Sequence, residues 1–235
     1  MKLALALIAG LALAAPVAAK PAAAAVPKAA HWAEVYAATA DGGYRRGNPN
    51  AKVKLIEYGS MTCPHCRAFH QEAMTPLIDK YVAAGTLSYE YRSFILNAPD
   101  FAAALIARCS GNPKTFFSAL NSFYPDQPVW TQPFIDVSEA DQKKLNDLPE
   151  DKRVPALAVI GKLDVYAAKL GMSRARFDAC EADKVQTDKL LAMRKVATET
   201  YKVPSTPAFL INGTYQENTY NWAALEPLLQ AVLKP

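Results

Sequence analysis

Two cysteines separated by two residues, Cys63 and Cys66, are the side chains of this sequence whose spacing points most directly to chemistry. The apolar run at residues 53–58 precedes them and predicts a buried strand. Apolar residues then recur at helical spacing from 68 to 81, so we expect a helix to begin at or just after Cys63. A thiol on the first turn of a helix meets unpaired backbone N–H groups and the positive end of the helix dipole. We therefore predict that the pKa of Cys63 lies well below the ~8.5 of a free thiol.

The neighbours of Cys63 suit that position. Pro64 fits the first turn of a helix because no backbone donor is needed there. His65, when protonated, would stabilise the thiolate further. Cys66 is expected to be buried one turn into the helix and to react only within the protein.

Thiol–disulfide exchange is the chemistry that this arrangement predicts. A substrate thiolate would attack Cys63 of the oxidised pair and release Cys66, and a second substrate thiol would resolve the mixed disulfide. A stabilised Cys63 thiolate is a good leaving group and favours the reduced pair, so the pattern predicts an oxidising protein.

Other uses of a CxxC pair fit the sequence less well. Attachment of c-type haem requires C-x-x-C-H, and Arg67 follows the second cysteine. A zinc ion would need His65 or His70 besides the cysteines, and no second CxxC or histidine pair lies nearby in the sequence, so we expect no metal and no cofactor. His70 is instead expected on the surface of the helix. An inert structural disulfide stays open, although so short a loop stabilises little through chain entropy.

The N-terminal 19 residues have the form of a secretory signal peptide. Lys2 supplies the positive start, residues 3–13 the apolar core, and residues 17–19 a small-residue cleavage site. The apolar run is too short for a comfortable membrane span, and an uncleaved anchor is the alternative. Export places the chain where disulfides persist, so we expect a periplasmic protein.

Composition restricts the function further. The formal net charge of the 235 residues is +4, and acidic and basic residues are interspersed. The sequence has no cluster of Lys and Arg interleaved with aromatic residues, so nucleic-acid binding is not indicated. About 215 residues follow the signal, enough for one large domain or one domain with an insertion.

The remaining periodicities predict an α/β fold that contains a helical block. Residues 20–44 form a lead-in, and 87–96 a second strand that contains one base, Arg92. From 100 to 202 the pattern is helical, with one helix over 155–170 and an irregular loop marked by three prolines between 125 and 133. A strand at 207–211, a hairpin turn and a helix at 221–233 complete the chain.

Several motifs resemble the thioredoxin superfamily, and in particular its DsbA-like periplasmic oxidoreductases. They are the C-P-H-C run at 63–66, the segment 47–51, Glu57 six residues before Cys63, and the segment 205–213. The resemblance implies a thioredoxin fold formed by residues 45–97 and 185–235, with a helical domain inserted at 98–184.

The resemblance also assigns roles outside the CxxC motif. It implies that Thr206 and Pro207 form a cis-proline loop facing the cysteines, where the backbone of Thr206 pairs with an extended substrate. Spacing alone indicates only the start of an edge strand at Pro207. Glu57 matches a buried acid that handles the proton of Cys66, whereas an exposed acid at a strand edge is the alternative. The lysine that partners this acid in some relatives is not evident in the strand that holds Arg92.

Cys109 and Cys180 lie on two helical stretches of the predicted insertion. They are either two free buried thiols or a structural disulfide, and some members of the family carry such a second bridge. A loop of about 70 residues would contribute roughly 4 kcal/mol in the chain-entropy description.

The sequence therefore predicts a periplasmic thiol:disulfide oxidoreductase that donates its Cys63–Cys66 disulfide to exported proteins with free thiols. The resemblance adds a DsbB-type, quinone-linked membrane partner that would reoxidise the pair. We expect a monomer, because the lead-in leaves no room for the dimerisation domain of the isomerase branch. Two alternatives stay open: a disulfide reductase or isomerase, which Thr206 favours, and a non-catalytic, peptide-binding holdase whose cysteines are structural.

Overall fold

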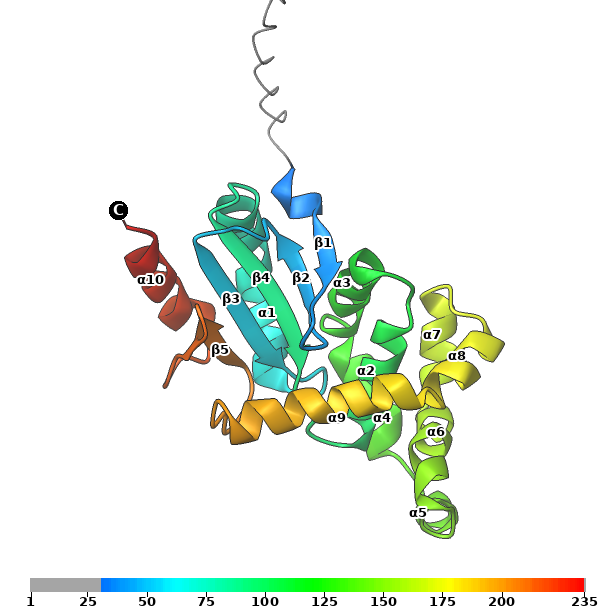
Figure 1. Cartoon of the computed structure of the whole chain (residues 1–235). Coiled ribbons are helices and arrows are strands. Elements are labelled where there is room, and N and C mark those ends of the chain that lie inside the picture. The colour runs from blue at the N-terminus through cyan, green and yellow to red at the C-terminus, as the bar shows by residue number, and fades with distance from the viewer. Residues whose placement is uncertain (1–30, 235) are drawn as a thin grey trace, which may run out of the picture. The chain divides into compact units, whose positions relative to one another are not determined.

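A six-stranded mixed sheet forms the centre of the computed structural model, which describes residues 31–234 (Figure 1). The predicted signal peptide and the first part of the lead-in lie outside the described residues. The strands follow the order β1-β2-β4-β3-β5-β6 across the sheet. Their bounds are β1 Tyr36–Ala38, β2 Tyr44–Gly47, β3 Val53–Gly59, β4 Leu87–Ser93, β5 Ala208–Ile211 and β6 Thr214–Tyr215.

The central strand β3 pairs in parallel with β4 and antiparallel with β5. Val53 and Leu55 are fully buried in the core that β3 shares with the helix after the cysteines. Tyr58 points to the opposite face and packs with Ala197 and Val203. Both faces of the sheet are covered, so β4 has an almost continuously buried sequence rather than a half-exposed alternation.

Helix α1 (Pro64–Pro76) begins directly after Cys63, as the sequence predicts. Pro76 lacks the N–H that would continue the α-helical hydrogen bonds, and a π-helical turn, η2 (Leu77–Val82), follows it. Gly85 then reverses the chain with φ of +74°, close against the ring of Trp32.

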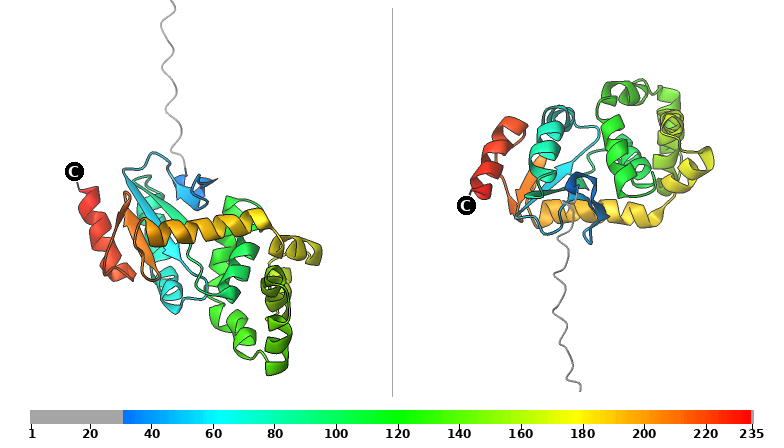
Figure 2. Two further views of the ribbon diagram at one scale, coloured as in Figure 1. Left: turned by 60° about the horizontal axis from the view of Figure 1, so that its bottom comes forward. Right: turned by 90° about the horizontal axis from the view of Figure 1, so that it is seen from above.

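The residues from 98 to 184 form a helical block beside the sheet, and α9 runs from this block back across one sheet face (Figures 1 and 2). No helix among residues 31–234 combines the length and the apolar character that a membrane span requires. The helix bounds are α2 Ala98–Arg108, α3 Pro113–Phe123, α4 Gln127–Ile135, α5 Glu139–Asn146, α6 Glu150–Ile160, α7 Leu163–Lys169, α8 Arg174–Glu181, α9 Lys184–Glu199 and α10 Trp222–Leu233.

Two expectations for this block were wrong. The proline-marked stretch is not an irregular loop, because it forms α4: Pro128 lies in its first turn, where proline is tolerated, and Pro133 removes one donor. The single helix expected over 155–170 is divided at Gly161, and Lys162 there adopts a left-handed conformation with φ of +59°. The ring of Phe134 lies where a side chain at Gly161 would stand, so this turn requires glycine.

A disulfide links Cys109 at the end of α2 to Cys180 of α8. The two cysteines are 71 residues apart, and the bond ties the first helix of the block to its last. Cys180 is buried and Cys109 is half-buried.

The loop that this bond closes predicts its contribution to stability. Replacement of both cysteines by serine should lower the free energy of unfolding by about 4 kcal/mol, because the unfolded chain regains the entropy of an open loop. Denaturant unfolding of the oxidised proteins measures the difference, which should vanish when a strong reductant is present. Equal unfolding midpoints under oxidising conditions would contradict it.

Candidate active site

The turn between β3 and α1 places Cys63 at the N-cap of the helix and Cys66 on its first turn. Both thiols are free, and both are nearly inaccessible, with 5% of Cys63 and none of Cys66 exposed. The Cys63 thiol donates a hydrogen bond to the carbonyl oxygen of Thr206, 3.3 Å away. Pro64 and His65 are exposed beside it.

The surroundings of Cys63 lower its pKa to about 5. The largest contribution is a hydrogen bond from the Cys66 thiol; the Thr206 side chain and the backbone N–H groups of Cys66 and His65 add to it, while burial opposes them. The predicted direction of the shift is therefore correct, and the helix N-terminus is one of its causes. The main donor is the partner thiol.

The same geometry raises the pKa of Cys66 well above its ordinary value. Burial is the main cause, and the hydrogen bond with Cys63 and the charge of Glu57 act in the same direction. The backbone N–H of Ser60, 3.5 Å from the sulfur, acts in the other direction and favours a Cys66 thiolate. Cys63 therefore ionises readily, whereas Cys66 stays protonated.

Thr206 and Pro207 lie opposite Cys63, directly before β5, and the peptide bond between them is cis. Thr206 is 7% exposed; its hydroxyl lies near enough to the Cys63 sulfur to lower the pKa of that thiol, although it makes no hydrogen bond of ordinary geometry with any described residue. The pairing of β5 with β3 brings this segment to the active-site end of the sheet, across more than 140 residues of sequence.

Glu57 of β3 is completely buried below the cysteines, so it is not an exposed acid at a strand edge. It accepts a hydrogen bond from the hydroxyl of Tyr89, while its second oxygen has no partner in the part of the chain that the structure describes. Burial raises the pKa of Glu57 to about 8, and the negative charge of Cys63 contributes to the rise.

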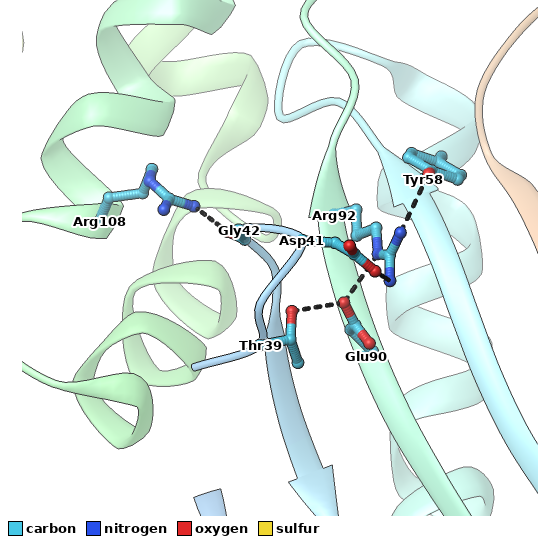
Figure 3. Close-up of polar contacts among 7 residues, drawn as sticks. All are labelled: Thr39, Asp41, Gly42, Tyr58, Glu90, Arg92 and Arg108. Atoms are coloured by element: carbon cyan, nitrogen blue, oxygen red, sulfur yellow. Dashed lines mark hydrogen bonds and ion pairs between the residues drawn. The ribbon is translucent and has the colours of Figure 1, made fainter. Parts of the chain in front are cut away.

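Arg92, the base of the neighbouring strand, faces away from Glu57. It stands in register with Tyr58 on the opposite face of the sheet. There its guanidinium donates to Glu90 at 2.7 Å, to Asp41 at 2.8 Å and to the hydroxyl of Tyr58 at 3.3 Å (Figure 3). The groups that surround Glu57 are tyrosines instead, because the alternation along β4 places Tyr89 on the side of Glu57.

His70 is buried rather than exposed on the helix surface, so that expectation was wrong. Its ring packs against Tyr124, with 4.7 Å between the ring centroids. Tyr124 follows α3, so the helical block covers a side of α1 that would face water without it. Burial lowers the pKa of His70 to about 4, and the residue is a neutral packing partner near neutral pH.

Two further polar residues reach the cysteine turn, and the sequence analysis missed both. Asp100 of α2 and Gln127 of α4 are 1% and 6% exposed, and both bind the backbone directly before Cys63. Asp100 lies in the first turn of α2, where acidic residues are common, so its position in the sequence did not mark it as part of the site. No local signal marked Gln127, because its contacts span more than 60 residues.

Comparison with known proteins agrees with this geometry. The model of a family described as thioredoxin matches residues 39–231, so the chain belongs to the thioredoxin family. A protein of Rickettsia typhi named "putative protein-disulfide oxidoreductase" is 31% identical over 173 residues. That match covers 73% of this chain and 55% of the relative, so the chain spans about half the length of such relatives. The thiol:disulfide interchange protein DsbL of Lelliottia amnigena is 25% identical, with 78% of this chain and 79% of that protein covered.

Solved structures show the same fold. The crystal structure of a protein-disulfide isomerase from Novosphingobium aromaticivorans matches with a TM-score of 0.78 and 33% identity, over 84% of this chain and all of that chain. Wolbachia pipientis alpha-DsbA1 matches with a TM-score of 0.62 and 21% identity, over 81% and 88%. The latter match, at 21% identity, is a likeness of fold alone.

The raised pKa of Glu57 predicts how stability depends on pH. The unfolded carboxyl releases its proton near pH 4.5 and the folded one near 8, so the folded state binds more protons between these values. The wild type should therefore lose stability relative to Glu57→Gln as the pH rises through this window, by up to about 1.4 kcal/mol per pH unit, and no further above it.

Urea unfolding of the reduced proteins at several pH values tests this prediction. Glu72→Gln, an exposed position on α1, is the matched control and should leave the pH profile of the wild type unchanged. Parallel profiles of Glu57→Gln and the wild type from pH 4.5 to 8 would show that Glu57 ionises in the folded protein as it does in water.

Proposed function

We propose that this protein is a thiol:disulfide oxidoreductase that donates the Cys63–Cys66 disulfide to exported proteins with free thiols. The opposite pKa shifts of the two cysteines are the observation that carries the proposal. An inert structural disulfide, or a holdase with structural cysteines, has no need for one thiol with a pKa near 5 at the start of a helix. The names of the Rickettsia and Lelliottia relatives support the same chemistry.

The reaction transfers two electrons from the substrate to the protein. A substrate thiolate attacks the sulfur of Cys63; a substrate–Cys63 bond forms, the Cys63–Cys66 bond breaks, and Cys66 leaves with the electron pair. A second substrate thiolate attacks the substrate sulfur of this mixed disulfide, and Cys63 leaves as a thiolate. The substrate is released with a disulfide, and the protein is reduced.

Glu57 supplies a proton in the first step. Cys66 has a raised pKa and is a poor leaving group unless its sulfur is protonated as the bond breaks. Below pH of about 8 the buried carboxyl of Glu57 holds a proton, and Cys66 and Glu57 are close enough for the charge of one to raise the pKa of the other. Its oxygen without a partner is free to donate that proton to Cys66, directly or through water.

Thr206 and Pro207 bind the substrate beside the sulfur. The backbone of Thr206 pairs with an extended segment of the unfolded substrate, which gives affinity with little dependence on substrate sequence. The carbonyl that accepts from the Cys63 thiol shows how close this backbone lies to the reacting atom. Pro64 and His65 are exposed on the other side of Cys63 and complete the contact surface.

Location and partners belong to the same proposal. The chain would be exported to the periplasm by its N-terminal signal, act as a monomer, and be reoxidised by a DsbB-type membrane protein. The cysteine turn, Glu57 and Thr206 lie in the thioredoxin-like segments 45–97 and 185–235, while residues 98–184 form the helical insertion.

A disulfide isomerase or reductase is the second candidate. It is favoured by the 33% identity with the Novosphingobium protein, whose whole length is matched and whose name is protein-disulfide isomerase. Threonine at position 206, which resembles the isomerase branch of the family, favours the same candidate.

The reduction potential of the Cys63–Cys66 pair decides between the two. We expect a value near the ~−120 mV of a strong oxidant after equilibration with glutathione, together with oxidation of reduced, unfolded ribonuclease A. A value near the ~−270 mV of thioredoxin, without oxidation of ribonuclease, would move the protein to the reductase branch.

The asymmetry of the pair predicts which cysteine forms the mixed disulfide. Cys66→Ser should accumulate a covalent complex with a disulfide-containing partner such as oxidised ribonuclease A unfolded in urea, because the Cys63 thiolate attacks that disulfide, one partner sulfur leaves as a thiolate, and no internal thiol releases the complex. Cys63→Ser should accumulate none, because Cys66 is buried and protonated. Non-reducing electrophoresis separates the two results.

Alkylation gives an independent measurement on the same variants. The rate of reaction of Cys66→Ser with iodoacetamide should rise around the pKa of its remaining thiol, well below 8.5.

Trapping of substrate by Cys63→Ser to the same extent as by Cys66→Ser would reverse the assignment.

A further inference from the structure

We infer that the helical insertion positions the redox turn, and that Asp100 and Gln127 are positioning residues that hold the backbone before Cys63 so that its donors meet the two sulfur atoms. The inference rests on the proposed function, because it assigns these residues an effect on the chemistry of the cysteine pair. Neither side chain contacts a sulfur atom among the hydrogen bonds of residues 31–234, so both would act through the backbone.

Asp100 joins the turn to the end of β4. One of its carboxylate oxygens accepts from the N–H of Met61 at 2.8 Å, and the other accepts from the N–H of Leu96 at 2.9 Å. Asn97, the N-cap of α2, accepts from the N–H of Asp100 and donates to the hydroxyl of Thr62 at 3.0 Å. The first turn of α2 therefore holds the cysteine turn from one side.

Gln127 holds the same turn from α4. Its side-chain nitrogen donates to the carbonyl of Met61 at 2.6 Å and to the carbonyl of Cys63 at 3.0 Å. The hydroxyl of Tyr124 donates to the carbonyl of Ser60 at 3.4 Å. Three consecutive helices of the insertion thus bind the backbone between Ser60 and Cys63, which has no strand partner in that interval.

The backbone N–H groups of the turn between Ser60 and Cys63 make hydrogen bonds beside the cysteine pair. The N–H of Ser60 points at the sulfur of Cys66, and the N–H of Cys63 donates to the carbonyl of Ser60 at 3.2 Å. The Cys63 carbonyl begins the helical hydrogen bonds by accepting from Arg67. A shift of this backbone would move the sulfur of Cys63 relative to the helix N–H groups that stabilise its thiolate.

Burial makes these contacts strong. Asp100 and Gln127 lie in the protein interior, where a hydrogen bond to a charged group is worth more than in water and an unpaired group costs more. Burial raises the pKa of Asp100 to about 6, and the donors of the two loops that it joins, which are the backbone N–H groups of Leu96, Met61 and Thr62 and the Ser60 side chain, oppose that rise.

The test compares Gln127→Met with the wild type, because methionine keeps most of the volume and removes the donor. We expect the pKa of Cys63, followed by thiolate absorbance of the reduced protein, to rise by about 1 unit. The equilibrium constant for oxidation of glutathione by the protein should fall about tenfold, or about 30 mV in the reduction potential. Gln132→Met, an exposed glutamine on the same helix, is the matched control and should change neither value.

Asp100→Asn provides a second, milder variant, since the amide keeps one acceptor oxygen and turns a donor toward one of the two N–H groups. It should raise the pKa of Cys63 by less than Gln127→Met does, whereas Asp151→Asn, an exposed acid in the first turn of α6, should not change it. If Gln127→Met does not fold, this variant alone decides the question.

Normal values of the pKa and of the glutathione equilibrium in folded variants with lowered stability would overturn the inference, because Asp100 and Gln127 would then be structural only. The pKa of Cys63 is measured without a protein substrate. A wild type that fails to oxidise ribonuclease would therefore count against the proposed function and leave this test to be decided by its own result.

Discussion

The stabilisation of a nearly buried anion at the sulfur of Cys63 is the constraint on which the rest of the structure depends. A thiolate with 5% of its residue exposed cannot rely on water, so the protein must supply every donor. The Cys66 thiol, the Thr206 side chain and two backbone N–H groups of α1 do so. The pairing of β5 with β3 brings Thr206 to this place, and the turn after β3 starts α1 there.

Cys63 and Cys66 differ in pKa although both are buried, because each responds to a different neighbour. Cys63 receives hydrogen bonds at the helix start, whereas Cys66 donates one and lies beside Glu57 in the interior. Two or three negative charges so close together would repel one another in a low-dielectric site. Ionisation of Cys63 therefore keeps Cys66 and Glu57 protonated. The reduced site then holds one anion, the Cys63 thiolate, beside two neutral acids.

The sequence predicted the parts of this site that are local in the chain. The strand at 53–58, the helix after Cys63 and the lowered pKa of Cys63 depend on neighbouring residues and are correct. The burial of His70, the orientation of Arg92 and the helix at 127–135 depend on contacts with remote segments and were wrong or open. Asp100 and Gln127 were missed for the same reason, because their hydrogen bonds to Met61 join residues 39 and 66 positions apart, respectively.

The pKa of Cys63 is lowered and that of Glu57 is raised, so the two groups have opposite effects on how the stability of the reduced protein depends on pH. The folded pKa of Cys63 is depressed, so its contribution grows as the pH rises from about 5 towards the ordinary value of the thiol and is lost as the pH falls through 5. The folded pKa of Glu57 is raised to about 8, so its contribution falls over much of the same range. The oxidised pair has no titrating thiol, and only the loss from Glu57 remains. Reduction therefore stabilises the fold by an amount that grows as the pH rises from about 5 towards the ordinary pKa of the thiol, and the same free energy favours the reduced pair over the disulfide.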